Sequence, residues 1–180
     1  MNLYLRLLRV LARALRRAGS LGPLDASVLR FRVMPHDLDL NLHVNNGRYF
    51  TLMDLGRVDL LARLGLVRPI VAHRWMPVVA AATLRFKRSL DPFDAFTVHT
   101  RLLCWDDRWF YLSQHFERDG RVVAEGTVRA LFKGPEGVVP SRVVIAASGA
   151  APPASPPMPP AVALWVQGLD GDAAESRAAV

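Results

Sequence analysis

The stretch that decides the fold is DLDLNLHVNNGRYFTLMDLGRVDLLARLGL, residues 37–66. Its first ten residues hold two aspartates, one histidine and three asparagines, and an apolar pattern with helical spacing follows at once. Asn45 is a good N-cap residue, and Gly65 is a typical stop signal. The stretch therefore predicts a long amphipathic helix over about 45–66 that is entered through a polar loop.

Two interpretations of the polar loop are open. Aspartate and asparagine before a helix commonly form turns and caps, which would make the loop purely structural. The Asp39, Asn41 and His43 array also suits acyl transfer, because a strand would place all three on one face and a loop would keep them close. Asp39 would then attack a thioester carbonyl or activate a water, while Asn41 and His43 would orient the reacting groups.

The start of the predicted helix adds a second set of polar groups. Asn45, Asn46 and Gly47 would supply free backbone N–H groups at the positive end of the helix dipole, where they would stabilise an oxyanion. Asp54, two turns further on, is a candidate second carboxylate. We favour the alternative that Asp54 forms an ion pair with Arg57, which lies three residues on at the same helix face.

The rest of the central region predicts strands. The segment LRFRVMPHD, residues 29–37, indicates a strand that enters the polar loop, and four more strands are expected over 76–88, 95–105, 109–118 and 121–133. The Asp-Gly pair at 119–120 predicts a hairpin. We expect an α+β fold in which a five-stranded antiparallel sheet packs on one long helix.

The N-terminal segment, residues 1–25, is predicted to be an arginine-rich amphipathic helix. Arg6, Arg9, Arg13 and Arg16 recur every three or four residues, mostly away from the leucines. Arginine interrupts the apolar run too often for a membrane span or a signal peptide. Either residues 1–18 lie on an anionic membrane surface, or the helix packs on its own domain or a partner chain.

The central domain is expected over 26–145, and a proline-rich tail follows over 146–180. Six prolines between 152 and 160 predict a semi-rigid extended linker. The segment AVALWVQGL, 161–169, is expected to dock as a short helix with Trp165 as its anchor.

Charge and residue usage exclude several classes of function. The net charge is +7, and five arginines within residues 1–18 account for all but +2 of it, so no nucleic-acid partner is expected. The single cysteine, Cys104, cannot form an intrachain disulfide, which fits a reducing cytoplasm. The spacing of the histidines matches no metal motif, and we expect no metal and no cofactor.

Two segments carry a resemblance to a known family. HDLDLNLHVNNGRYFTLMDLGR, residues 36–57, resembles the hotdog-fold thioesterases, including plant acyl-carrier-protein thioesterases. KRSLDPFDAFTVHTRLLCWDDRWFYL, residues 87–112, is similar to vertebrate thioesterase-superfamily-member proteins. The resemblance implies a hotdog fold, in which the sheet wraps around the helix, and a homodimer or dimer of dimers.

The same resemblance implies hydrolysis of an acyl-CoA or acyl-carrier-protein thioester. Asp39, Asn41 and His43 match the catalytic array, and the backbone amide that binds the thioester oxygen falls at Asn46. Ser89 stands where the plant enzymes carry a glutamate. His43 follows Asp39 by four residues, where hotdog hydratases have five and a proline, which argues against a hydratase.

We therefore expect a cytoplasmic thioester hydrolase, with a peripheral position on the inner membrane face as a further expectation. The alternative is a non-catalytic hotdog protein that binds an acyl chain or associates with a membrane.

Overall fold

The computed structural model of the protein describes residues 2–149 and 154–178. The helices are α1 (Asn2–Leu15), the 3-10 helix η1 (Pro35–Asp37), α2 (Asn46–Arg63), α3 (Val67–Ala72), α4 (Ser141–Ala147) and α5 (Pro160–Ala178). The strands are β1 (Ser27–Arg32), β2 (Met76–Phe86), β3 (Ala95–Trp105), β4 (Phe110–Arg118), β5 (Arg121–Gly134) and β6 (Gly137–Val139). The five predicted strands and the long helix are confirmed, but the first strand ends at Arg32 instead of continuing to residue 37, where η1 forms. The elements η1, β6, α3 and α4 are additional.

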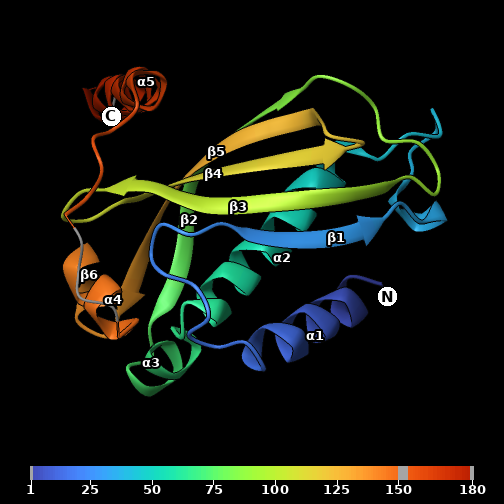
Figure 1. Ribbon diagram of the computed structural model, residues 1–180. Coiled ribbons are helices and arrows are strands. Elements are labelled where there is room, and N and C mark those ends of the chain that lie inside the picture. The colour runs from blue at the N-terminus through green and yellow to red at the C-terminus, as the bar shows by residue number, and fades with distance from the viewer. Residues whose placement is uncertain (1, 150–153, 179–180) are drawn as a thin grey trace.

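The strands form one antiparallel sheet in the order β1-β3-β4-β5-β2, and the short β6 pairs with β5. The sheet curls around α2, which lies against its inner face (Figure 1). Asp119 and Gly120 both have positive φ, 51° and 71°, as a two-residue hairpin turn of the predicted kind requires. The predicted α+β hotdog arrangement of a sheet wrapped around one long helix is confirmed.

Helix α2 begins and stops at the predicted signals. The Asn45 side chain accepts a hydrogen bond from the Gly47 N–H at 2.9 Å, and Gly65 adopts φ +77° just beyond the last turn. Along the helix, Gly56 lies against Thr100 of β3, and a Cβ at Gly56 would be 2.4 Å from the Thr100 hydroxyl oxygen. Only glycine therefore permits this close approach of the helix to the sheet.

Helix α1 packs on its own domain beside α2 (Figure 1), with Val10 and Ala14 buried. Arg6 is half-buried, unlike the exposed Arg9 and Arg13. Its guanidinium donates to both carboxylate oxygens of the buried Asp37, at 3.0 and 2.7 Å. Tyr4 and Leu8 on α1 remain 73% and 62% exposed. Within the described part of the chain, no helix combines the length and apolar character needed to cross a membrane.

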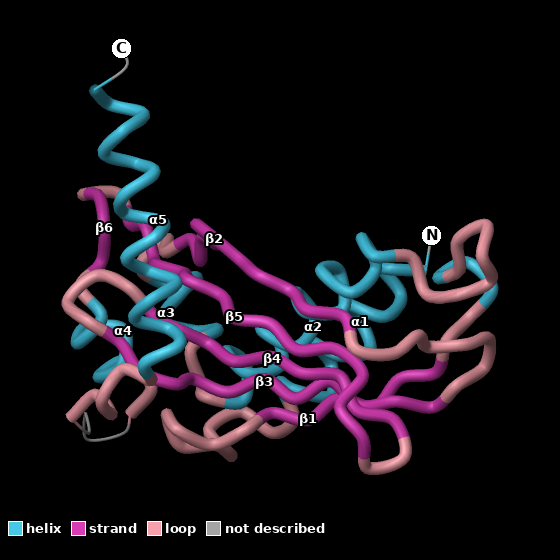
Figure 2. Tube along the Cα trace, turned by 90° about the horizontal axis from the view of Figure 1, so that it is seen from above, coloured by secondary structure: helices cyan, strands magenta, loops and turns pink. Residues whose placement is uncertain are grey.

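The tail helix α5 crosses the ends of β3, β4 and β5 on the face of the sheet away from α2 (Figure 2). Val162 is buried there with Cys104 and Tyr111. The expectation that Trp165 anchors this helix is wrong, since Trp165 is only half-buried and Val162 occupies the contact. The helix covers 19 residues, more than the predicted short segment, and residues 150–153 of the predicted linker lie outside the described residues.

Candidate active site

The polar stretch before α2 forms a tight loop. An isolated bridge joins Leu38 to Val44. Inside it, the Asp39 N–H donates to the His43 carbonyl at 2.9 Å, and the Leu42 N–H donates to the Asp39 carbonyl at 3.1 Å. Leu42 takes φ +59°, a conformation that non-glycine residues rarely adopt and that functional loops often contain. The stretch is therefore a loop, one of the two geometries that the sequence leaves open.

The Asp39 carboxylate is held by this loop. Its Oδ1 accepts hydrogen bonds from the backbone N–H groups of Asn41, at 2.8 Å, and His43, at 3.4 Å. Asp39 is half-buried, whereas Asn41 and His43 are exposed. Among the described residues, no hydrogen bond joins the side chains of these three. The structure thus brings the three residues together through their backbone, with the carboxylate in a fixed position.

Asp37, which the sequence did not single out, fixes the base of the loop. Its side chain is buried, it accepts from the Met34 N–H at 3.0 Å, and it binds Arg6. The Asp37 carbonyl also accepts from the Asn45 N–H at 2.8 Å, while the Val44 N–H donates to the Leu90 carbonyl at 3.0 Å. The loop is therefore tied at both ends to buried structure.

A second carboxylate faces His43. The His43 Nε2 lies 3.4 Å from an Asp91 carboxylate oxygen, and both side chains are about half exposed. The same oxygen accepts from the Ser89 hydroxyl at 3.3 Å. On its other side, Asp91 lies 3.5 Å from the Arg118 guanidinium, which also binds Asp94. Asp91 was missed in the sequence because it is 48 residues from His43 and no local pattern links the two.

The N-terminus of α2 leaves one backbone donor free. The Gly47 N–H is taken by the Asn45 side chain, and the Arg48 N–H donates to the Asn45 carbonyl at 2.8 Å. The Asn46 N–H has no hydrogen-bond partner among residues 2–149 and 154–178. This donor stands at the positive end of the helix dipole, where an anionic oxygen is stabilised.

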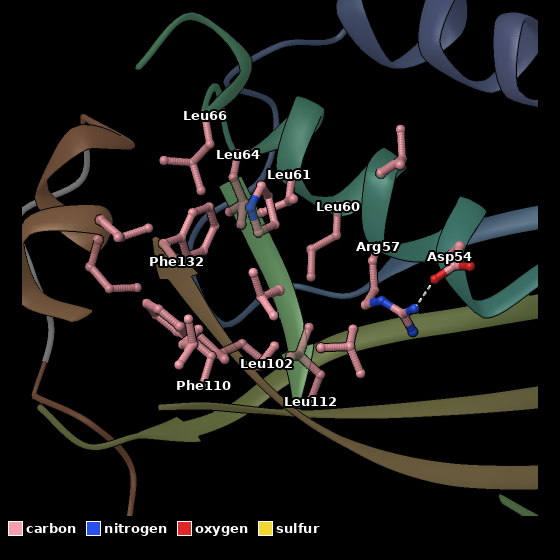
Figure 3. A pocket seen from close by; sticks show the side chains of 18 residues that line it. Asp54, Arg57, Leu60, Leu61, Leu64, Leu66, Leu102, Phe110, Leu112 and Phe132 are labelled. Carbon is pink, nitrogen blue, oxygen red and sulfur yellow. Dashed lines mark hydrogen bonds and ion pairs between the residues drawn. The ribbon is translucent and has the colours of Figure 1, made fainter. Parts of the chain in front are cut away.

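A cavity of about 380 Å³ lies between the second half of α2, the strands β2 and β5, and α4. Its walls are aliphatic and aromatic, and they include Leu60, Leu64, Leu112 and Phe132 (Figure 3). Such an apolar lining suits a hydrocarbon chain better than a polar group.

Asp54 and Arg57 form the polar end of this cavity (Figure 3) and are joined by an ion pair, which confirms the favoured interpretation of Asp54. Arg57 also donates to the buried Gln114 side chain at 2.6 Å. Gln114 in turn donates to the Thr100 hydroxyl at 2.8 Å and to the Met53 carbonyl at 2.9 Å. Burial lowers the pKa of Arg57, and the neighbouring Asp54 opposes that shift. The network therefore fixes Arg57 at the cavity wall.

The polar loop and the cavity are separate within one chain. None of the residues that line the cavity comes from the loop 38–45. Asn46 and Asp54 are eight residues apart on α2, which corresponds to about 12 Å along the helix axis. One chain thus has an anchored carboxylate and a free backbone amide at the N-terminal end of α2. The apolar cavity begins at the middle of the same helix.

Comparison with known proteins finds a matching family model, similar sequences and similar solved structures. A family model described as the thioesterase-like superfamily matches residues 33–166, which include the polar loop, α2 and β2 to β6. The protein THEM6 of Xenopus laevis is 43% identical over 84 residues, 47% of this chain and 41% of that protein. The thioesterase poxG of Penicillium oxalicum is 29% identical over 118 residues, 58% of this chain and 39% of that protein.

The chain spans about half the length of the curated relatives it matches. Among solved structures, the gentisyl-coenzyme A thioesterase BH1999 is 26% identical, with a TM-score of 0.61. That likeness covers 69% of this chain and all of the other. The likeness therefore lies in the sheet-and-helix core that positions the loop and the cavity.

Proposed function

Because the chain belongs to the thioesterase-like superfamily, we propose that it hydrolyses an acyl thioester to a free acid and a thiol. One observation carries the proposal: the unpaired Asn46 N–H lies at the start of α2, directly after a loop that holds the Asp39 carboxylate. A thioester carbonyl placed on that N–H would develop its negative charge against a fixed donor, and such electrostatic stabilisation is usually the largest contribution to acyl transfer.

Asp39 has two routes to the carbonyl carbon. In the first, its carboxylate attacks the carbonyl, the thiolate leaves, and water then hydrolyses the resulting anhydride to regenerate the carboxylate. In the second, the carboxylate takes a proton from a water that attacks the carbonyl, and that proton passes to the leaving sulfur. In both routes Asn41 and His43 orient the carboxylate, the water or the thioester.

Asp91 is proposed as the residue that positions His43. The plant enzymes that the sequence resembles have a glutamate where this chain has Ser89, and Ser89 donates to Asp91, which faces His43. The carboxylate missing at position 89 is thus supplied two residues further along the same segment.

The proposed substrate is an acyl-CoA with an aliphatic chain, with an acyl-carrier protein as the second candidate. The cavity walls support a hydrocarbon, because Asp54 and Arg57 are the charged groups among its lining residues and they neutralise each other. A polar acyl group would lose its water contacts there without gaining partners.

The test is a panel of acyl-CoAs of increasing length, with free thiol read by a reporting dye. We expect hydrolysis by the native protein and a loss of about 10²–10⁴-fold in kcat for Asp39→Asn. Asp106→Asn is the matched control, because Asp106 likewise accepts backbone N–H groups of its own turn, from Arg108 at 2.8 Å and Trp109 at 2.6 Å. The control is expected to keep full activity.

Equal activity in Asp39→Asn and Asp106→Asn would contradict the proposal, because Asp39 would then have only a structural role in its turn. A chain that binds acyl-CoA but hydrolyses none of the panel would instead support the non-catalytic alternative.

The active unit is proposed to be a homodimer joined at the free edge of β2. Among the strands that the structure describes, β2 pairs with β5 alone, and long unprotected edges invite pairing with another chain. Val79 and Phe86 of this edge strand are each 43% exposed. The cavity is also lined by Pro77, Val78 and Val79, so a second copy at β2 would close it.

Light scattering tests the dimer. The native protein is expected at twice the chain mass of 20.0 kDa, and Val79→Asp at the chain mass with reduced hydrolysis. Val71→Asp on α3 is the control, because Val71 is an exposed valine that lies outside the edge strand and does not line the cavity. A fully active native monomer would contradict this part of the proposal.

A peripheral position on the inner membrane face is proposed through α1. Its exposed surface combines the apolar side chains Tyr4, Leu5 and Leu8 with the exposed arginines 9 and 13. An exposed apolar strip beside cations is typical of helices that lie in an anionic membrane interface.

Co-sedimentation with vesicles of phosphatidylglycerol and of phosphatidylcholine tests this contact. We expect binding to the anionic vesicles and its loss in the double variants Leu5→Ser/Leu8→Ser and Arg9→Gln/Arg13→Gln. Val71→Ser, an exposed apolar residue elsewhere, should bind normally. Unchanged binding in both double variants would remove the membrane contact from the account.

A further inference from the structure

The outer face of the sheet carries a cluster that the proposed hydrolysis does not use. The register of β3 and β4 places His99 directly opposite His115, and Glu117 follows two residues after His115 on the same face. This face is the one away from α2, because the neighbouring Val98 and Thr100 are buried on the helix side. The two imidazole rings are 4.4 Å apart between centroids and nearly parallel, at 11°.

The cluster presents three groups with lone pairs. One nitrogen of each histidine and one Glu117 carboxylate oxygen all lie within 4.8 Å of one another. A carboxylate oxygen of Glu117 lies 3.9 Å from the His99 Nε2. Among the described residues, Glu117 has no other ion-pair partner. Burial, and after it the neighbouring His99, lower the pKa of the His115 imidazole. All three side chains are half-buried, so a small ion can reach them from solvent.

We propose that His99, His115 and Glu117 bind one divalent transition-metal ion, for which zinc is the best match. Two imidazole nitrogens and one carboxylate oxygen form a ligand set that zinc accepts, and an open position would be filled by water. Calcium and magnesium prefer sites made of oxygen alone, which this cluster is not. A tetrahedral site with bonds of about 2.0–2.1 Å needs ligand atoms about 3.3 Å apart. Side-chain rotation on a fixed backbone supplies the remaining movement.

Histidine spacing along the chain cannot reveal this site. His99 and His115 are 16 residues apart, and only the hairpin register makes them neighbours. The metal would join β3 to β4 on the face opposite the proposed chemistry. Its expected effect is therefore on stability, and hydrolysis at Asp39 does not require it.

Calorimetric titration of zinc into untagged, chelator-treated protein tests the site. We expect one zinc per chain, and a melting temperature that rises by roughly 5–10 °C when free zinc is about 100 times Kd. His99→Gln and His115→Gln should each weaken binding by at least about tenfold. His73→Gln is the matched control, since His73 is exposed and stacks on Trp75 outside the cluster.

Circular dichroism of the metal-free variants reports whether each still folds. Glu117→Gln keeps the size and shape of the side chain, so it remains informative if a histidine variant fails to fold, and it too should weaken binding. Zinc binding that is equal in the native protein and in Glu117→Gln and His99→Gln would overturn the proposal. Equal loss of binding in His73→Gln would also overturn it.

Discussion

The two ends of α2 differ in what they offer a substrate. At the N-terminal end the groups that matter belong largely to the backbone: the free Asn46 N–H and the turn that holds Asp39. From Asp54 onward the helix contributes side chains, and with β2, β5 and α4 they enclose an apolar cavity. In the proposed reaction, one helix therefore separates the place of chemistry from the place where the acyl chain is recognised. The first requires fixed donors and the second requires only shape and hydrophobicity.

The largest expected effect on stability comes from separating α2 from the sheet between its two ends. Gly56 lies between them, and Gly56→Ala would place a methyl group 2.4 Å from the Thr100 hydroxyl oxygen, which forces α2 away from β3. We expect the free energy of unfolding to fall by about 1–3 kcal/mol, as is typical of overpacking.

Urea unfolding measures this change. Gly168→Ala in α5 is the control, because it is also a helical glycine but a Cβ there meets nothing within 4 Å. Its stability should be unchanged or slightly higher. Equal stability of the two variants would show that the close approach of helix and sheet is unimportant.

The next substitution changes the cavity alone. Ala130 lines it from β5, and Ala130→Phe would fill part of the space without touching the polar loop. Hydrolysis of long-chain acyl-CoA should fall by roughly 10–100-fold in kcat/KM, while a short-chain substrate should be cleaved normally. A parallel loss for all chain lengths would mean that the cavity does not receive the acyl chain.

The smallest effect concerns the loop alone. Asp91→Asn removes the carboxylate charge that faces His43, and kcat should fall by about tenfold with little change in KM. Asp94→Asn is the control, because Asp94 pairs with Arg118 and accepts the Asp91 N–H at 2.8 Å but makes no contact with His43. If Asp94→Asn lowers kcat as much as Asp91→Asn, the effect belongs to Arg118 rather than to His43.

Features that depend on neighbouring residues along the chain could be predicted from the sequence. The Asn45 cap, the Gly65 stop and the strand over 95–105 are local, since neighbours along the chain determine them, and each is where it was expected. The polar residues around Asp39 are contiguous in the sequence, so a loop before the helix could also be predicted as one of two geometries.

The remaining features depend on contacts between distant segments. The pairing of Arg6 with Asp37 and of His43 with Asp91, and the wall of the cavity, are set by how helices and strands pack. The tail illustrates the same limit, because hydrophobicity alone pointed to Trp165 whereas the geometry of the sheet selects Val162.

The proposed reaction depends on the Asn46 N–H to stabilise the oxyanion, and one substitution removes that hydrogen with little other change. Asn46 is the first residue of α2, a position that proline favours because its N–H is unpaired in any case. The preceding Asn45, at φ −56° and ψ 136°, already has a conformation compatible with a following proline. Asn46→Ala is the matched control, since it deletes the side chain and keeps the N–H.

The decisive measurement is kcat for acyl-CoA hydrolysis by Asn46→Pro and Asn46→Ala, with their melting temperatures. We predict that Asn46→Pro loses about 10²–10³-fold in kcat at an unchanged melting temperature, while Asn46→Ala stays close to the native protein. If the folded proline variant hydrolyses the substrate as fast as the alanine variant, the backbone amide takes no part in the reaction and the account of this site is wrong.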